Sequence, residues 1–439
     1  MGIYEYEEAF GDWDRTSGTM RKAIEEWFGM YYQNQATAEQ DPCQRIAYTV
    51  VNKLVKTIFG EYKASAKDPA VLAAIEALDR QKKVAMQLAL VGGECYIKPC
   101  LGTAGLSFAL IPRNNVLIFG RNGGGEPTDI GTVEKSIWGK YYYTLLERRS
   151  VDEKGYLTIE NRLYRSTASR SLGNQAALTE HPQYRSLAPR YRYPMAVGSV
   201  GLARMKTPMV NCVDGSADGV AVFAPAVGLI RNIDRNEAQM NGEFSRGESR
   251  IIASADMLGK NMRGDRELTE HLFVGLDEDP ERVGLTIFSP ALREQSFLAR
   301  KQEYLRNVES VIGLKRGMLS DANAEDRTAT EIASSAGDYN LTVIDFQDMW
   351  ENVVRQVVDI CCVLSRLYKL PVPKNTQVSI DWGNGILYDE DKTWEEYKAM
   401  VASGLLKPEI ALGWRFNMPV DTEAELTAIR QKYMPTGTQ

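Results

Sequence analysis

Apolar residues recur at intervals of three and four along a long segment in the last third of the sequence. The stripe consists of Phe346, Met349, Val353, Val357, Ile360, Leu364 and Leu367. This spacing places the side chains along one face of an α-helix, and residues 328–370 predict one nearly continuous helix on the order of 60 Å long. Gly337 is the expected position of a kink. Such a stripe must be covered, either by the rest of the chain or by another subunit.

The first half of the chain changes from helical to strand patterns. Helical spacing predicts three amphipathic helices, at residues 20–33, 42–61 and 68–91. The second and third begin at Asp-Pro pairs, which suit a helix N-cap followed by its first turn. Short β-branched and aromatic runs, separated by Gly, Asn and Pro, predict strands between residues 94 and 166. Residues 201–224 have little periodicity and are interpreted as a long connection.

Two further helical patterns, at residues 225–246 and 290–314, enclose a short segment of strand and turn patterns at 250–289. This order predicts a helical hairpin with a small β unit at its tip. The long helix follows, then a strand at 377–383 and a helical tail. The sequence therefore predicts an α+β fold.

The composition is that of a soluble globular chain, with 439 residues, 44% of them hydrophobic and 25% charged. No run reaches the roughly 18 apolar residues of a membrane helix. The N-terminal residues lack the basic and apolar regions of a secretory signal. The net charge of −6 argues against a tight grip on nucleic acid, so any contact with DNA is expected to be loose or local.

The histidines and cysteines of this chain do not form a recognisable catalytic or metal-binding pattern. The two histidines, His181 and His271, are too few for a metal site or a His-based triad and are interpreted as surface residues. The cysteines match no zinc pattern and are interpreted as buried thiols in a reducing compartment. They are Cys43, Cys95, Cys100, Cys212, Cys361 and Cys362.

The glycine run at 121–127 lacks the ending of a phosphate loop and predicts a flexible turn.

Neighbouring carboxylates are the remaining candidates for chemistry. Such pairs can hold Mg²⁺ or carry out acid–base catalysis, but most are solvated turn residues. The pairs are Asp277 with Asp279, Asp389 with Asp391, and Glu325 with Asp326. No nucleophile with a matching base is found, so no catalytic residue, metal ligand or cofactor-binding residue is assigned.

The segment "EDRTATEI" at 325–332 reads as a helix start. Thr328 and Glu331 have the spacing of a capping box, and Asp326 is an alternative N-cap. A loop rich in charged residues precedes it. Its charged residues are Lys315, Arg316, Asp321, Glu325, Asp326 and Arg327.

Several segments resemble the portal proteins of tailed bacteriophages, in the order in which that family arranges them. "GLARMKTPMVNCVDGSADGVAVFAPAVGLIRNIDR" is similar to the entry into the first stem helix, and "DRTATEI" to a recurrent segment before a long helix. "GLSFALIPRNNVLIFG" and "GYLTIENRLYRS" resemble wing strands, and "YDEDKTWEEYKAMVASGLLKPEIAL" resembles the C-terminal region. Each motif is short, and their common order carries the resemblance over residues 20 to 430.

The resemblance implies a division of the chain into the portal domains. The expected fold has an α/β wing, a two-helix stem, a small clip, a long kinked wing helix and a small helical crown. The expected boundaries are 1–224 for the first part of the wing, 225–249 and 290–314 for the stem helices, 250–289 for the clip, 315–327 for the tunnel loop, 328–385 for the long helix and the rest of the wing, and 386–439 for the crown.

The resemblance also implies a structural role without a cofactor. Portal proteins form a ring, usually a dodecamer, at one vertex of the phage capsid. Double-stranded DNA is packaged through the ring by terminase, whose large subunit is an expected partner, and is later ejected. Head-completion or adaptor proteins, the major capsid protein and a scaffolding protein are the other expected partners. The expected location is the virion, after assembly in the host cytoplasm.

A channel that passes DNA must not hold it. Twelve copies at −6 each carry −72, which repels phosphate from an acidic wall. Lys315, Arg316 and Arg327 are expected to supply weak phosphate contacts, with solvated charges paired to Asp321 and Glu325 as the equal alternative. Further basic residues on the expected stem helices are Arg231, Arg235, Arg293, Arg300 and Lys301.

Two other functions stay open at this point. One is a metal-dependent hydrolase that uses carboxylates near Asp277 or Asp389. The other is a head or adaptor protein without a channel, which would assemble only with a partner.

Overall fold

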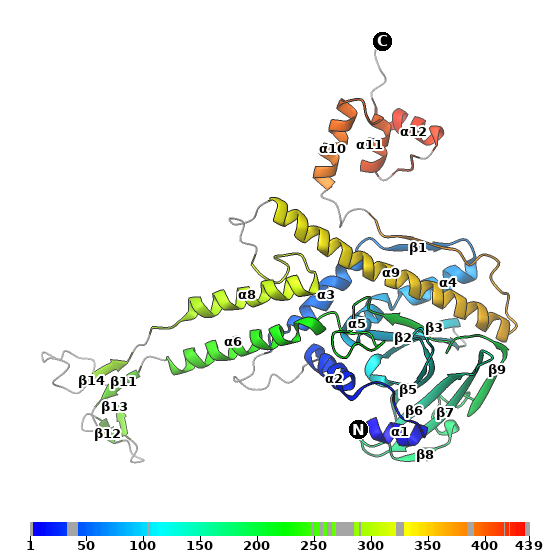
Figure 1. Cartoon of the computed structure of the whole chain (residues 1–439), viewed down its shortest axis with the longest axis horizontal. Helices are drawn as coiled ribbons and strands as arrows, with labels where there is room; N and C mark the ends of the chain where they lie inside the picture. The colour runs from blue at the N-terminus through cyan, green and yellow to red at the C-terminus, as the bar shows by residue number, and fades with distance from the viewer. Residues whose placement is uncertain are drawn as a thin grey trace, which may run out of the picture.

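The computed structural model gives an α+β protein with three visible parts: a body, a projecting two-helix arm and a group of C-terminal helices (Figure 1). The structure describes residues 3–32, 43–102, 105–247, 250–253, 258–260, 266–268, 285–288, 291–321, 329–383, 390–416, 418–420 and 422–434. Among these residues, no helix has the length and apolarity needed to cross a membrane.

The predicted long helix is confirmed as α9 (Ala329–Leu367). It remains helical through Gly337, so the structure shows no interruption there. The centre of its stripe, from Phe346 to Val357, is buried, whereas Leu364 and Leu367 are only half-buried. The helix packs against α3 (Ile46–Ile58) and α4 (Pro69–Asp79). The stripe is therefore covered mainly by this chain itself.

The predicted helix at 68–91 is two helices. α4 begins after Asp68, whose carboxylate accepts a hydrogen bond from the Ala70 amide at 2.9 Å, and α5 spans Lys82–Gly92. At the break, Asp79 accepts a hydrogen bond from the Tyr62 hydroxyl at 3.1 Å and pairs with Lys82 at 3.7 Å. The polar residues between the two apolar runs thus allow the chain to change direction. With α3 and α2 (Gly18–Tyr32), these helices enclose the main core.

Two antiparallel sheets form the rest of the body. The larger has the strand order β4-β5-β6-β7-β8, and β9 also pairs with β7. Its strands are β4 (Val116–Arg121), β5 (Pro127–Trp138), β6 (Tyr141–Val151), β7 (Tyr156–Ser166), β8 (Asn174–Ala176) and β9 (Arg190–Ala196). The smaller has the order β10-β2-β3, with β2 (Glu94–Gly102), β3 (Gly105–Pro112) and β10 (Ala203–Lys206). Helix α1 (Ile3–Phe10) lies beside the larger sheet.

The interpretation of residues 201–224 as a plain connection is wrong. Its first part is β10, which pairs antiparallel with β2, and residues 220–223 are fully buried in the main core. An irregular segment can fill a core without helical or strand periodicity, because its apolar side chains need only face inward.

The glycine run is confirmed as a turn between β4 and β5, where the Asn122 amide donates a hydrogen bond to the Glu126 carbonyl at 2.9 Å.

The arm consists of α6 (Val227–Arg246) and α8 (Glu294–Ile312), which pack against each other along their length (Figure 1). Between them, β11 (Arg250–Ala253) pairs with β14 (Leu285–Phe288), and β12 (Leu258–Lys260) pairs with β13 (Arg266–Leu268). Both pairs are antiparallel and lie at the far end of the arm.

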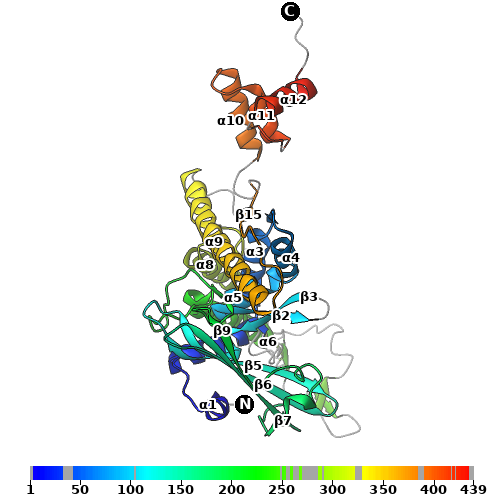
Figure 2. The ribbon, with the colours of Figure 1, turned by 90° about the vertical axis from the view of Figure 1, so that its right-hand side faces the viewer.

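The chain after α9 returns to the body before it leaves again. β15 (Val378–Asp381) pairs antiparallel with β1 (Lys63–Ala66). Helices α10 (Glu390–Ala402), α11 (Pro408–Arg415) and α12 (Glu423–Tyr433) then form a separate group, as Figure 2 shows from the side. A capping box starts α12, where Thr422 and Glu425 bond to each other's backbone amides.

Candidate functional site: the arm and the loop that follows it

Polar contacts hold the two helices of the arm together. Arg293 donates to the Glu243 carboxylate through two nitrogens, with Nη2 to Oε2 at 2.6 Å and Nε to Oε1 at 3.2 Å. These hydrogen bonds lower the pKa of Glu243. Lys301 lies 3.0 Å from the Glu237 carboxylate, and the Asn236 amide donates to the Phe297 carbonyl at 3.0 Å. The two helices are therefore joined at several levels by specific pairs.

The other predicted basic residues of the arm also have partners in the chain. These are Arg231 with Glu26, Arg235 with Asn232, and Arg300 with the hydroxyl of Tyr304. The structure thus places all five predicted basic side chains of these helices in contacts within the subunit. The carboxylates paired with Arg231, Arg293 and Lys301 reduce the positive charge that the arm offers to an external anion, whereas Arg235 and Arg300 have neutral partners and keep their full charge.

The loop after α8 is organised by one buried carboxylate. The helix ends at Gly313, whose φ of +78° is in the left-handed region that suits glycine at a helix end. Glu309 is 0% exposed and accepts hydrogen bonds from the amides of Gly317 at 3.2 Å, Leu319 at 2.5 Å and Ser320 at 2.8 Å. The Ser320 hydroxyl donates a fourth, at 2.8 Å.

Two further side chains hold the same loop. Gln302 donates to the Asp321 carboxylate at 2.8 Å and accepts from the Asp321 amide at 2.8 Å. Lys53 of α3 donates to the Met318 carbonyl. The loop is therefore attached both to the arm and to the body.

The predicted channel residues fall into two groups. Lys315 and Arg316 are exposed at the start of the loop, and Asp321 is exposed but bonded to Gln302. Glu325, Asp326, Arg327 and Thr328 lie outside the described residues. Glu331 lies in the first turn of α9, and the cap that it was expected to form with Thr328 stays a prediction.

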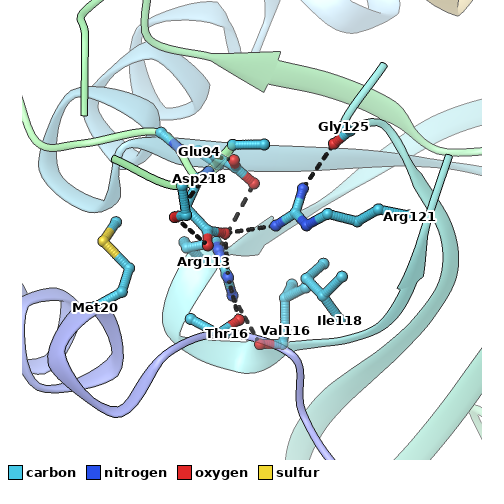
Figure 3. A network of polar contacts seen from close by, with 12 residues as sticks. Thr16, Met20, Glu94, Arg113, Val116, Ile118, Arg121, Gly125 and Asp218 are labelled. Carbon is cyan, nitrogen blue, oxygen red and sulfur yellow. Dashed lines mark hydrogen bonds and ion pairs between the residues drawn. The ribbon is translucent and has the colours of Figure 1, made fainter. Parts of the chain in front are cut away.

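The body contains a buried ionic network that the sequence did not single out (Figure 3). Arg113 is 0% exposed and donates to Asp218 at 2.8 Å, to the Thr16 hydroxyl at 2.7 Å and to the Val116 carbonyl at 2.9 Å. Arg121 reaches the same Asp218 oxygen at 2.7 Å. The network thus joins the segment before α2, the turn after β3 and the segment before α6.

A second carboxylate extends this network towards the long helix. Glu94 accepts from Arg204 at 2.6 Å, from the Tyr96 hydroxyl at 2.8 Å and from the Gly219 amide at 2.8 Å. Burial opposes its ionisation, but the guanidinium groups of Arg204 and Arg113 prevail and lower the pKa of Glu94 from 4.5 to about 2. The backbone of Arg204 is in turn hydrogen-bonded to the Gln356 side chain of α9, at 2.9 and 3.3 Å.

The candidates for metal or catalytic chemistry are not brought together in the part of the chain that the structure describes. No group of three or more His, Cys, Asp or Glu residues there could hold a metal ion. Asp277, Asp279 and Asp389 lie outside the described residues, and Asp391 lies at the start of α10.

Two interpretations of single residues are corrected. His181 is 4% exposed instead of lying on the surface, because its ring stacks on Tyr184 at 4.6 Å and meets the edge of Tyr143 at 5.1 Å. Cys95 and Cys362 are buried as expected, but Cys212 is exposed in the segment before α6. His271 lies outside the described residues.

Comparison with protein families gives a match to the model described as phage portal protein, SPP1 Gp6-like, over residues 133–432. The matched region begins within β5 and runs through the arm, the loop after α8, α9 and the C-terminal helices. A comparison with curated proteins finds no match. Because the family match covers more than half of the sequence, this chain belongs to the phage portal protein family of the SPP1 Gp6-like type.

Proposed function

We propose that this protein assembles into a ring at one vertex of the phage capsid and forms the channel through which double-stranded DNA is packaged and ejected. Membership in a structural family of phage portals carries the proposal. The narrow arm supports it, because a projecting helix pair offers long faces to neighbouring copies of the same chain. Terminase, head-completion or adaptor proteins, the capsid protein and a scaffolding protein are the proposed partners. The proposed locations are the host cytoplasm during assembly and the virion afterwards.

The proposed domains follow the elements of the fold. We assign α6 and α8 to the stem, the strands between them to the clip, residues 315–327 to the tunnel loop and residues 386–439 to the crown. Residues 1–224 and 328–385 form the proposed wing. The burial of α9 against α3 and α4, and its link through Gln356 to the ionic network, support placing the long helix in the wing.

The electrostatics of the arm suit a conduit. Lysine and arginine gain affinity for DNA by releasing counterions, so many unpaired cations would retain the strand. The pairs Arg293 with Glu243 and Lys301 with Glu237 place acidic groups beside the basic ones. Lys315 and Arg316, with Arg327, remain the proposed weak phosphate contacts.

The mass and shape of the purified protein test the ring. A conduit predicts a closed ring of many copies by native mass measurement and negative-stain microscopy. A stable monomer that assembles only after a partner is added would instead support an adaptor without a channel.

Packaged DNA per head tests the phosphate contacts. The triple variant Lys315→Ala, Arg316→Ala, Arg327→Ala is expected to form normal rings and to package less DNA. Arg190→Ala, which changes a basic side chain that is 72% exposed on β9, is the matched control. Unchanged packaging by the triple variant would remove these residues from the mechanism.

A further inference from the structure

The buried carboxylate of Glu309 lies where the α-helix itself disfavours it. The last turn of a helix carries a partial negative charge, which favours basic side chains and opposes acidic ones. Burial adds a cost that only strong hydrogen bonding can offset. Glu309 nevertheless occupies the last turn of α8, between the buried residues Val308 and Ile312. Its role is therefore to be sought in what it binds.

What Glu309 binds is the loop. Three backbone amides and one hydroxyl between residues 317 and 320 donate to its two oxygens. Together with the contacts from Lys53 to Met318 and from Gln302 to Asp321, these bonds attach each part of residues 317–321 to a helix.

Lys315 and Arg316 occupy the bend between the helix end and this attached segment. The Met318 amide donates to the Lys315 carbonyl at 3.1 Å, which closes the bend on itself. Leu314, just before the two cations, is buried. The backbone that carries the cations is thus fixed on both sides, while their side chains are exposed.

We propose that Glu309 is a positioning residue that keeps the backbone of Lys315 and Arg316 in one place on each subunit. From there the two side chains contact the DNA phosphates. This inference rests on the proposed function and deepens it. A loop that could move would follow the DNA backbone and optimise its contacts, which would slow transport. With residues 314–321 held in place, only the two side chains adjust, so each contact is weak and is exchanged as the duplex passes.

The test begins with the loop itself. Glu309→Gln keeps the shape of the side chain but replaces one acceptor oxygen by a donor that faces amide donors. Amide hydrogen exchange in residues 317–320 of the assembled protein is expected to rise about tenfold or more. Ser320→Ala, which removes one of the four hydrogen bonds, is the milder second variant and is expected to give a smaller rise. Glu303→Gln, on the same helix at a side chain that is 63% exposed, is the control and is expected to change nothing.

The second measurement is packaged DNA per head, in a mutant cycle with Lys315→Ala, Arg316→Ala. If Glu309 acts through the two cations, Glu309→Gln alters packaging in the wild-type background and adds nothing when both cations are absent. An equal change in both backgrounds, or unchanged exchange in residues 317–320, overturns the inference. Ring formation is recorded for every variant, because failure of the wild-type chain to form rings would instead refute the proposed function.

Discussion

The guanidinium of Arg113 and the carboxylate of Asp218 form an ion pair at 2.8 Å, with exposed side-chain fractions of 0% and 3%. The two residues are more than a hundred positions apart in the sequence, and the pair joins the turn after β3 to the segment that enters the arm. This buried pair is therefore one of the contacts that join the body to the segment leading into α6.

Removing Arg113 is expected to be strongly destabilising. Arg113→Ala leaves Asp218 with Arg121, and Glu94 with Arg204, as the remaining guanidinium partner, and it creates a buried cavity. The combined cost is on the order of 3 kcal/mol in the free energy of unfolding. Denaturant unfolding of the purified protein measures the loss. The exposed Arg190→Ala serves as the control and is expected to cost less than about 1 kcal/mol. Equal losses for the two variants would contradict the structural role of the pair.

The same network predicts the response to acid. The pKa of Glu94 is lower in the folded protein, about 2, than its ordinary value of 4.5, so the unfolded chain binds the proton more readily. The stabilising contribution is complete above pH 4.5 and is lost as the pH falls towards 2. The free energy of unfolding, measured from pH 7 to pH 3, is expected to lose this contribution only below about pH 4.5. The decline is expected to be shallower in Glu94→Gln, and an identical slope would argue against it.

Gly93 is expected to tolerate no side chain. Its φ is +78°, and an added Cβ would lie 2.2 Å from the carbonyl oxygen of Gly219. Gly93→Ala is therefore expected to lower the free energy of unfolding by about 2 kcal/mol or more. Gly29, inside α2 with nothing within 4 Å of an added Cβ, is the matched control. Gly29→Ala is expected to raise stability by about 0.5–1 kcal/mol, so thermal melting of the two variants should shift in opposite directions.

Thiol labelling of the native protein is expected to modify Cys212 first. Burial raises the pKa of Cys95 to about 12 and that of Cys361 to about 12, which suppresses their reactive thiolates. Cys212 is exposed. A maleimide reagent followed by mass spectrometry should modify Cys212 faster than Cys95 and Cys361, and Cys212→Ser should abolish this fast modification. Fast labelling of Cys95 in the native protein would contradict its burial.

Sequence reasoning predicted best where a long element repeats one pattern. The stripe of α9 gave the helix to within a few residues at each end, because each turn repeats the same apolar spacing. The break between α4 and α5 was missed, since apolar residues continue at helical spacing on both sides of it. Residues 220–223 were missed because an irregular core segment has no period to detect.

The buried charges could be predicted only in part. Arg113, Glu94 and Asp218 come from three separate segments, and only the topology brings them together. The position of Glu309 in the sequence does indicate a buried carboxylate. It lies on the apolar face of α8 with Leu305, Val308 and Ile312, where an acidic residue needs hydrogen-bond donors to be tolerated.

β15 pairs with β1 and is the last strand that the chain adds to the body before α10 begins. The three C-terminal helices therefore form an addition at the end of the chain, connected to the body by one segment only. Helices attached in this way can be replaced or lengthened during evolution without a change in the body.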